Sequence, residues 1–137
     1  MGPIEYQLLA ERTENKDFEG IKQRLSVTKT TRLIHAAQGL CTEAGEFTDT
    51  LKKHVFYGKE LDDINLAEEL GDIMWYIAEA CNALGIRLDL VMHRNIAKLK
   101  ARYPEKFEER DALRRNLDAE RVILEGKECA DAEDPRR

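Results

Sequence analysis

Apolar side chains recur at helical spacing along three stretches of this chain, at 30–55, 63–84 and 88–102. Residues three, four and seven apart share one face of an α-helix, so each stretch predicts a helix with one apolar stripe. Pro104 follows the third stretch and stops it. Because only 8 Gly and 3 Pro occur among 137 residues, few positions interrupt helices. The sequence therefore predicts an all-α fold, a helical bundle of about four core helices.

Turn residues indicate where the long helices begin and end. Gly58 is expected to end the first, Asp62 or Asp63 to cap the second, and Gly85 to end it. We expect one domain over 1–137, with its core at about 28–107. The other segments are a short helix at 4–12, a polar connection with some helical tendency at 13–28, and a charged C-terminal extension at 108–137 that is helical over 108–124 and frayed from 126 onward.

The apolar stripes are expected to face the helical core. Their members are Leu33, Ile34, Ala37, Leu40, Cys41, Ala44, Phe47, Leu51 and Val55 on the first helix, Ala67, Leu70, Ile73, Met74, Ile77, Cys81 and Leu84 on the second, and Leu88, Val91, Met92, Ile96 and Leu99 on the third.

Composition excludes several classes of protein. The net charge is -5 and the pI about 5.3, whereas a general nucleic-acid binder shows a clustered basic surface. No stretch is apolar enough to span a membrane, and the N-terminus lacks the apolar core of a signal peptide, so we expect a cytoplasmic protein. The three cysteines, Cys41, Cys81 and Cys129, are widely spaced and are expected to be reduced, the first two in the core.

Two pairs of carboxylates, Glu43 with Glu46 and Glu69 with Asp72, accompany the first two long helices. Residues three apart lie about one turn apart on one helix face, so each pair presents its oxygens in one direction. If the two helices pack antiparallel, all four carboxylates converge, and their mutual repulsion calls for a divalent cation. Mg²⁺ is the natural candidate, with Mn²⁺ as a substitute, because hard cations prefer carboxylate oxygens.

Small and polar side chains lie on the same flanks as these pairs. Gly39 costs about 1 kcal/mol relative to Ala within a helix, so its place beside the first pair indicates room for a ligand. The flanking residues are His35, Ala36, Gly39, Thr50 and Lys53 beside the first pair, and Asn65 and Tyr76 beside the second.

Three segments together resemble a known family, the MazG-like nucleoside triphosphate pyrophosphohydrolases of the all-α NTP pyrophosphatase superfamily. They are LCTEAGEFTDTLKK, AEELGDIMWYIAEACNALGI and NIAKLKARYP, and the resemblance covers 33–107. It implies an all-α homodimer or homotetramer that cleaves nucleoside triphosphates between the α and β phosphates, releasing a nucleoside monophosphate and pyrophosphate. It also implies a role in keeping the nucleotide pool clean.

The resemblance implies that the four carboxylates bind Mg²⁺. Glu46 is our candidate for the catalytic base, since a carboxylate not fully used as a ligand can accept a proton from water. Many relatives carry a second glutamate directly before the first pair, where this chain has Thr42. The candidate substrate-binding residues are Asn95, Lys98 and Arg102 for phosphate oxygens, together with Lys53, His35 and Tyr76.

Other functions predict other features. A carboxylate-bridged di-iron protein needs Glu-x-x-His motifs, and none of the three histidines follows a glutamate at that spacing. Phosphoribosyl-ATP pyrophosphohydrolase uses similar carboxylates, so it stays as an alternative. A non-enzymatic helical interaction module is the other alternative, favoured by the charged extension. Trp75 is expected to fill a subunit interface rather than to stack on a base.

Overall fold

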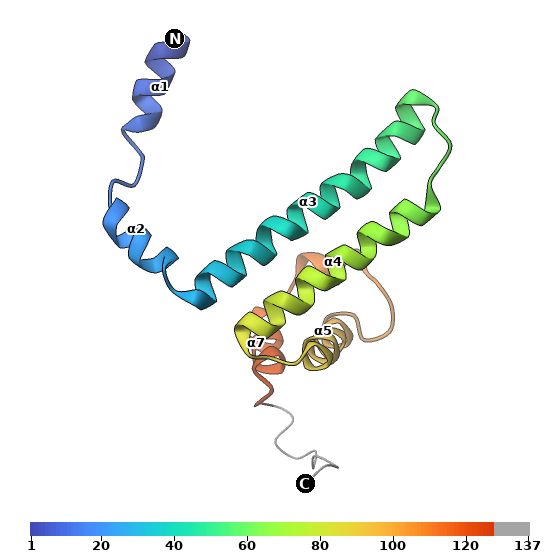
Figure 1. Ribbon diagram of the computed structural model, residues 1–137. Helices are drawn as coiled ribbons and strands as arrows, with labels where there is room; N and C mark the ends of the chain where they lie inside the picture. The colour runs from blue at the N-terminus through green and yellow to red at the C-terminus, as the bar shows by residue number, and fades with distance from the viewer. Residues whose placement is uncertain (128–137) are drawn as a thin grey trace. The chain divides into compact units, whose positions relative to one another are not determined.

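The computed structural model describes residues 1–127, and the regular elements of this part are α-helices (Figure 1). The predicted all-α class is confirmed. The chain separates into two compact units, Met1–Leu84 and a second one that begins at Gly85. The helices are α1 (Pro3–Glu11), α2 (Phe18–Leu25), α3 (Thr28–Tyr57), α4 (Asp63–Leu84), α5 (Leu88–Arg102), α6 (Glu109–Leu113) and α7 (Leu117–Glu125).

Local signals place the ends of the long helices as predicted. Gly58 and Gly85 follow α3 and α4 with φ of 67° and 69°, a left-handed conformation that glycine adopts without the penalty of a Cβ. Before α4, the Asp62 carboxylate accepts a hydrogen bond from the backbone N–H of Asn65 at 3.0 Å. This N-cap satisfies one of the backbone donors that a helix start leaves unpaired.

The structure adds detail in two segments. The helical tendency expected within the polar connection at 13–28 is realised as α2, whose first turn is capped by Asp17 accepting from the backbone N–H of Gly20 at 3.0 Å. The expected helix at 108–124 is divided into α6 and α7, because Asn116 starts a new helix by accepting from the backbone N–H of Ala119 at 3.1 Å. Fraying was predicted for 126–137, and most of this range, 128–137, lies outside the described residues. Cys129, which was predicted to be a reduced thiol, also lies outside them.

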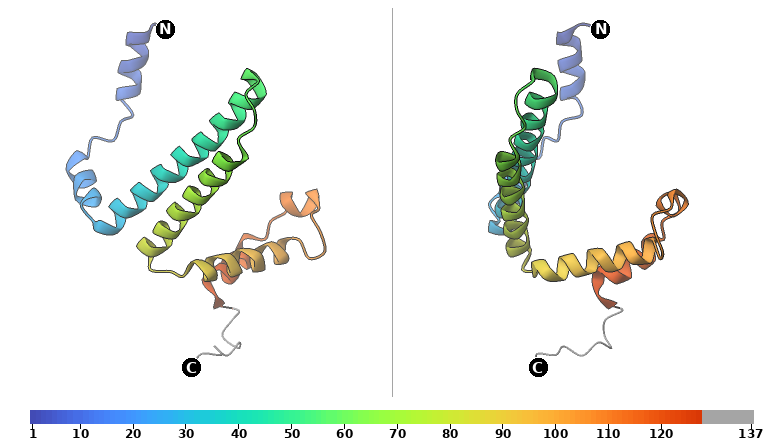
Figure 2. Two further views of the ribbon diagram at one scale, coloured as in Figure 1. Left: turned by 45° about the vertical axis from the view of Figure 1, so that its right-hand side comes forward. Right: turned by 90° about the vertical axis from the view of Figure 1, so that its right-hand side faces the viewer.

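In the first unit, α3 and α4 run antiparallel along each other and form a helical hairpin (Figures 1 and 2). The fully buried residues of this hairpin are small or polar, whereas larger apolar residues such as Leu40, Phe47 and Ile73 are half-buried. Ala36 is 1% exposed, and Gly39 and Glu69 are also buried. Small side chains let the two helices approach closely at Ala36 and Gly39, which lie beside the predicted stripe of α3.

The prediction that the stripes form the core is wrong for much of their length. Cys81 is buried as expected, whereas Cys41 is exposed. The reason is the choice of contacting face, because α3 meets α4 through the flank that carries Gly39 and Glu43. The exposed large apolar members of the stripes are Ile34, Leu51 and Val55 on α3, Leu70, Met74 and Leu84 on α4, and Val91, Met92 and Ile96 on α5.

In the second unit, α7 packs on α5. A buried ion pair joins them: Arg102 donates to Glu120 through Nε at 2.9 Å and through Nη2 at 2.5 Å. Arg115 donates to the same carboxylate at 2.8 Å. The predicted extension therefore contributes α7 to the same compact unit as α5. Across the described residues, no helix has both the length and the apolar composition that crossing a membrane requires.

Candidate metal centre

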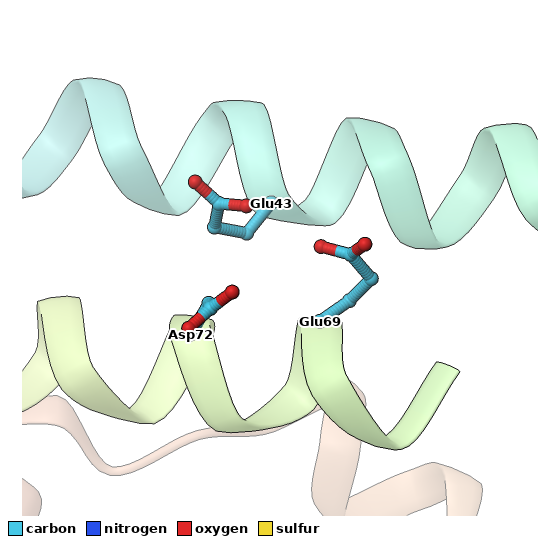
Figure 3. Close-up of side chains that lie close together, drawn as sticks. All are labelled: Glu43, Glu69 and Asp72. Carbon is cyan, nitrogen blue, oxygen red and sulfur yellow. The ribbon is translucent and has the colours of Figure 1, made fainter. Parts of the chain in front are cut away.

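Three carboxylates meet between the helices of the hairpin. Glu43 reaches from α3 toward α4, and Glu69 and Asp72 reach from α4 toward α3 (Figure 3). One oxygen from each lies within 4.8 Å of one oxygen from each of the others. The convergence that the sequence predicted thus holds for three of the four carboxylates.

The helical spacing of the pairs explains this placement. Glu69 and Asp72 are three residues apart, so both side chains lie on the side of α4 that faces α3. The trio does not include Glu46, which follows Glu43 by three residues and is exposed. Its assignment as a catalytic base stays a prediction.

Glu69 is the most enclosed member of the trio, with 5% of its surface exposed, whereas Glu43 is half-buried and Asp72 exposed. Burial is the main reason that the pKa of Glu69 is raised. A hydrogen bond from Asn65 opposes this rise, and the charges of Glu46, Glu43 and Glu68 add to it. The charges that raise the pKa of Glu69 are thus those of other acids.

A short chain of hydrogen bonds leads to Glu69 from α3. The Thr50 hydroxyl donates to Oδ1 of Asn65 at 2.6 Å, and Nδ2 of Asn65 donates to Oε1 of Glu69 at 3.0 Å. Sequence reasoning placed Thr50 and Asn65 on the flanks of the carboxylate pairs but gave them no role. The available signal was the spacing, since Asn65 precedes Glu69 by one helical turn.

The donor set fits a hard divalent cation. Carboxylate oxygens from two helices are suitable ligands for Mg²⁺ or Mn²⁺. Glu69 decides the fit, because a buried acid surrounded by other acids is costly to ionise without a counter-charge. A cation among Glu43, Glu69 and Asp72 supplies that charge.

Aromatic rings pack together further along the same hairpin. Tyr76 lies edge-on to His35 at 5.6 Å and to Trp75 at 4.9 Å between ring centroids. A Cβ added to Gly39 would lie 2.2 Å from the Tyr76 ring. The room predicted at Gly39 is therefore filled by Tyr76, which corrects the expectation that it stays open for a ligand. Trp75 is 54% exposed, and its predicted place in a subunit interface stays a prediction.

The candidate residues for binding phosphate, three cations and one amide, lie in both units. Lys53 on α3 forms an ion pair with Asp49 at 2.7 Å. Asn95 and Lys98 belong to α5, the first exposed and the second half-buried. Arg102, also on α5, is bound to Glu120. The substrate-binding roles of all these residues stay predictions.

Comparison with known proteins assigns the matched region to a family. The family model described as the MazG nucleotide pyrophosphohydrolase domain matches 33–107, more than half of the chain. The Gene 37 protein of Mycobacterium phage L5 is 40% identical over 76 residues, covering 51% of this chain. This chain spans 65% of the length of that relative. No solved structure gives a significant match.

The region matched by the family model contains both carboxylate pairs and most of the α3–α4 hairpin that brings three of the four acids together. The resemblance read from the sequence motifs is therefore confirmed, and the chain belongs to the family of the MazG nucleotide pyrophosphohydrolase domain.

Proposed function

We propose that this chain is a Mg²⁺-dependent pyrophosphohydrolase. Its substrates are nucleoside and deoxynucleoside triphosphates, which it cleaves between the α and β phosphates. The products are a nucleoside monophosphate and pyrophosphate, and the role is to clear unwanted nucleotides from the pool. Membership of the family supports the reaction class. The observation that carries the proposal is the buried Glu69 beside Glu43 and Asp72, a set of acids that needs a cation.

Glu43, Glu69 and Asp72 hold the ion in this proposal, and Mn²⁺ can replace Mg²⁺ there. When bound, a divalent ion neutralises phosphate oxygens and makes a water molecule more acidic. Glu46 accepts the proton of the attacking water, because it is exposed and close in sequence to the trio without belonging to it. The water oxygen forms the new bond to phosphorus as the bond to the bridging oxygen breaks.

Cationic and aromatic side chains bind the rest of the substrate in this proposal. Lys98 and Asn95 are three residues apart on α5 and can contact neighbouring phosphate oxygens. Arg102 is one turn beyond Lys98, and a phosphate there competes with Glu120 for the guanidinium. We assign Lys53 to the phosphates, and we assign the His35 and Tyr76 rings, which pack edge-on at 5.6 Å, to the nucleoside.

We also propose that the chain forms a homodimer or homotetramer. Leu70 and Met74 are 51% and 63% exposed. They are four residues apart on α4 and belong to its apolar stripe. Exposed apolar surface of this kind marks an interaction site, and a second copy offers a matching stripe. Changing Leu70 and Met74 together to Glu is expected to lower the mass measured by analytical ultracentrifugation. Ile64→Glu, at an exposed position outside the stripe, is the control that keeps the assembled mass.

The deciding experiment assays a panel of NTPs, dNTPs and phosphoribosyl-ATP for pyrophosphate release, with Mg²⁺, with Mn²⁺ and with EDTA. Glu69→Gln is expected to lose turnover, whereas Glu60→Gln, an exposed acid of the α3–α4 loop, retains it. Turnover restricted to phosphoribosyl-ATP would identify the related enzyme instead. Absence of metal-dependent turnover on every substrate would support the interaction module.

A further inference from the structure

The hydrogen-bonded chain that ends on Glu69 crosses from one helix of the hairpin to the other. Thr50 is on α3, while Asn65 and Glu69 are on α4. All three side chains are at least partly buried. A linkage of this length, enclosed between two helices, restricts the direction in which the Glu69 carboxylate can point.

Chemistry sets the direction of each bond in this chain. An ionised carboxylate only accepts hydrogen bonds, so the NH₂ group of Asn65 must face Glu69. The amide oxygen of Asn65 then faces Thr50, whose hydroxyl donates to it at 2.6 Å. With the amide reversed, two acceptor oxygens would meet at Glu69. The charged Glu69 therefore selects the amide orientation, and the hydroxyl of Thr50 adds a second hydrogen bond that holds the amide in place.

The position of Asn65 along α4 also matters. It lies one turn before Glu69, whereas Asp72 lies one turn after it. The amide donates to Oε1 of Glu69 at 3.0 Å. This hydrogen bond restrains one oxygen of Glu69 and leaves the carboxylate a second oxygen with which to coordinate a cation.

We infer that Asn65 and Thr50 are positioning residues that hold Glu69 in the orientation needed for the divalent cation. The inference rests on the proposed function, because it assigns Glu69 to a metal site. The two residues oppose the repulsion from Glu43 and Glu46, which would otherwise favour turning the Glu69 side chain away. They act through Glu69, without contact to the substrate.

Three variants test this role, a matched pair at Thr50 and one at Asn65. Thr50→Val removes the hydroxyl at nearly constant volume, and Thr50→Ser keeps it. Asn65→Leu removes the amide, while the backbone N–H of Asn65 keeps its capping bond to Asp62. The measurements are Mn²⁺ binding without nucleotide, by electron paramagnetic resonance, and the Mg²⁺ concentration that gives half-maximal turnover.

Asn65→Leu is expected to weaken Mn²⁺ binding and raise the Mg²⁺ requirement about 10- to 100-fold, the usual effect of removing a partner of a metal ligand. Thr50→Val should change both in the same direction by a smaller factor. Thr50→Ser should match the wild type. Turnover at saturating Mg²⁺ should largely recover in all three, a pattern that a general loss of structure would not produce.

Wild-type Mn²⁺ affinity and Mg²⁺ requirement in both Asn65→Leu and Thr50→Val would overturn the positioning role. If Asn65→Leu does not fold, as judged by circular dichroism, the Thr50 pair decides, and equal behaviour of Val and Ser overturns the inference. Glu69→Gln separates the two levels of the proposal. If Glu69→Gln loses Mn²⁺ binding while the Thr50 and Asn65 variants behave like the wild type, the metal site is supported and only the positioning role is overturned. If Glu69→Gln keeps both Mn²⁺ binding and turnover, the metal site and the positioning role are both overturned.

Discussion

Glu69 in the hairpin and Glu120 in the second unit are equally buried, each with 5% of its surface exposed, yet their surroundings are opposite. Glu120 accepts hydrogen bonds from Arg102 and Arg115, which lower the pKa of this carboxyl to about 2. Glu69 accepts from the neutral amide of Asn65 and lies near other acids, and its pKa is raised, mainly by burial.

The difference shows how to distinguish a structural acid from one that awaits a ligand. Glu120 is neutralised within the chain, so its charge supports the packing of α7 on α5. Glu69 accepts a hydrogen bond from a neutral amide and has acidic neighbours, so a bound cation or a proton would neutralise it. Burial is the same in both cases, and the sign of the neighbouring charge separates the two roles.

The largest expected effect is on catalysis, and it differs between the two acids. Glu69→Gln should lower turnover more than about 100-fold, because a metal ligand matters more than the outer partners whose loss costs 10- to 100-fold. Glu120→Gln should keep turnover near the wild-type value at saturating nucleotide and at temperatures where it is folded, because Glu120 acts only through Arg102. Pyrophosphate release at saturating Mg²⁺ measures both, and equal losses in the two variants would remove the distinction.

Thermal unfolding should respond to Mg²⁺ in the same selective way. Ligand binding to the folded state stabilises it by about 2.7 kcal/mol at a concentration 100 times the dissociation constant. Mg²⁺ should therefore raise the melting temperature of the wild type and of Glu120→Gln but not of Glu69→Gln, as followed by differential scanning fluorimetry with an EDTA baseline. A rise of equal size in Glu69→Gln would place the ion elsewhere.

The acid side of the stability profile should report Glu120. Its folded-state pKa of about 2 lies below the ordinary value of 4.5. A carboxylate with a depressed pKa stabilises the fold above its unfolded pKa, and this contribution is lost as pH falls toward 2. The melting temperatures of the wild type and Glu120→Gln should therefore differ most near neutral pH and converge between about pH 4.5 and 2. A gap that stays constant over this range would contradict the ion-pair assignment.

The smallest effect concerns the closely packed inner face that encloses Glu69. Gly39→Ala gains up to about 1 kcal/mol of helix propensity but forces its Cβ against Tyr76, and overpacking costs about 1–3 kcal/mol. We expect a net loss of up to about 2 kcal/mol. Gly71→Ala, whose Cβ has no neighbour within 4 Å, is the matched control and should stabilise by up to about 1 kcal/mol. Urea unfolding of both variants measures the difference, and equal stabilisation would show that Tyr76 yields easily.

The helices and most of their ends were predictable because they depend on residues a few positions apart. Periodicity located α3, α4 and α5, and Gly58, Gly85 and Asp62 marked their ends. The bounds of α2 and the break between α6 and α7 were not predicted, since short capped helices in polar segments carry little periodic signal.

The carboxylate pairs were also predictable from the sequence, because spacing along one helix decides which side chains share a face. The sequence by itself therefore determined the helical class, the long helices and the acids that each one presents. It indicated the family through the motifs around those acids.

Only the tertiary structure decided which faces meet. The contact of α3 with α4 buries Ala36, Gly39 and Glu69, leaves much of the apolar stripes exposed, and brings Thr50 to Asn65. The pairing of Arg102 with Glu120 likewise joins residues 18 positions apart. These outcomes depend on how side chains from distant segments fit together, a property that periodicity along one helix does not contain.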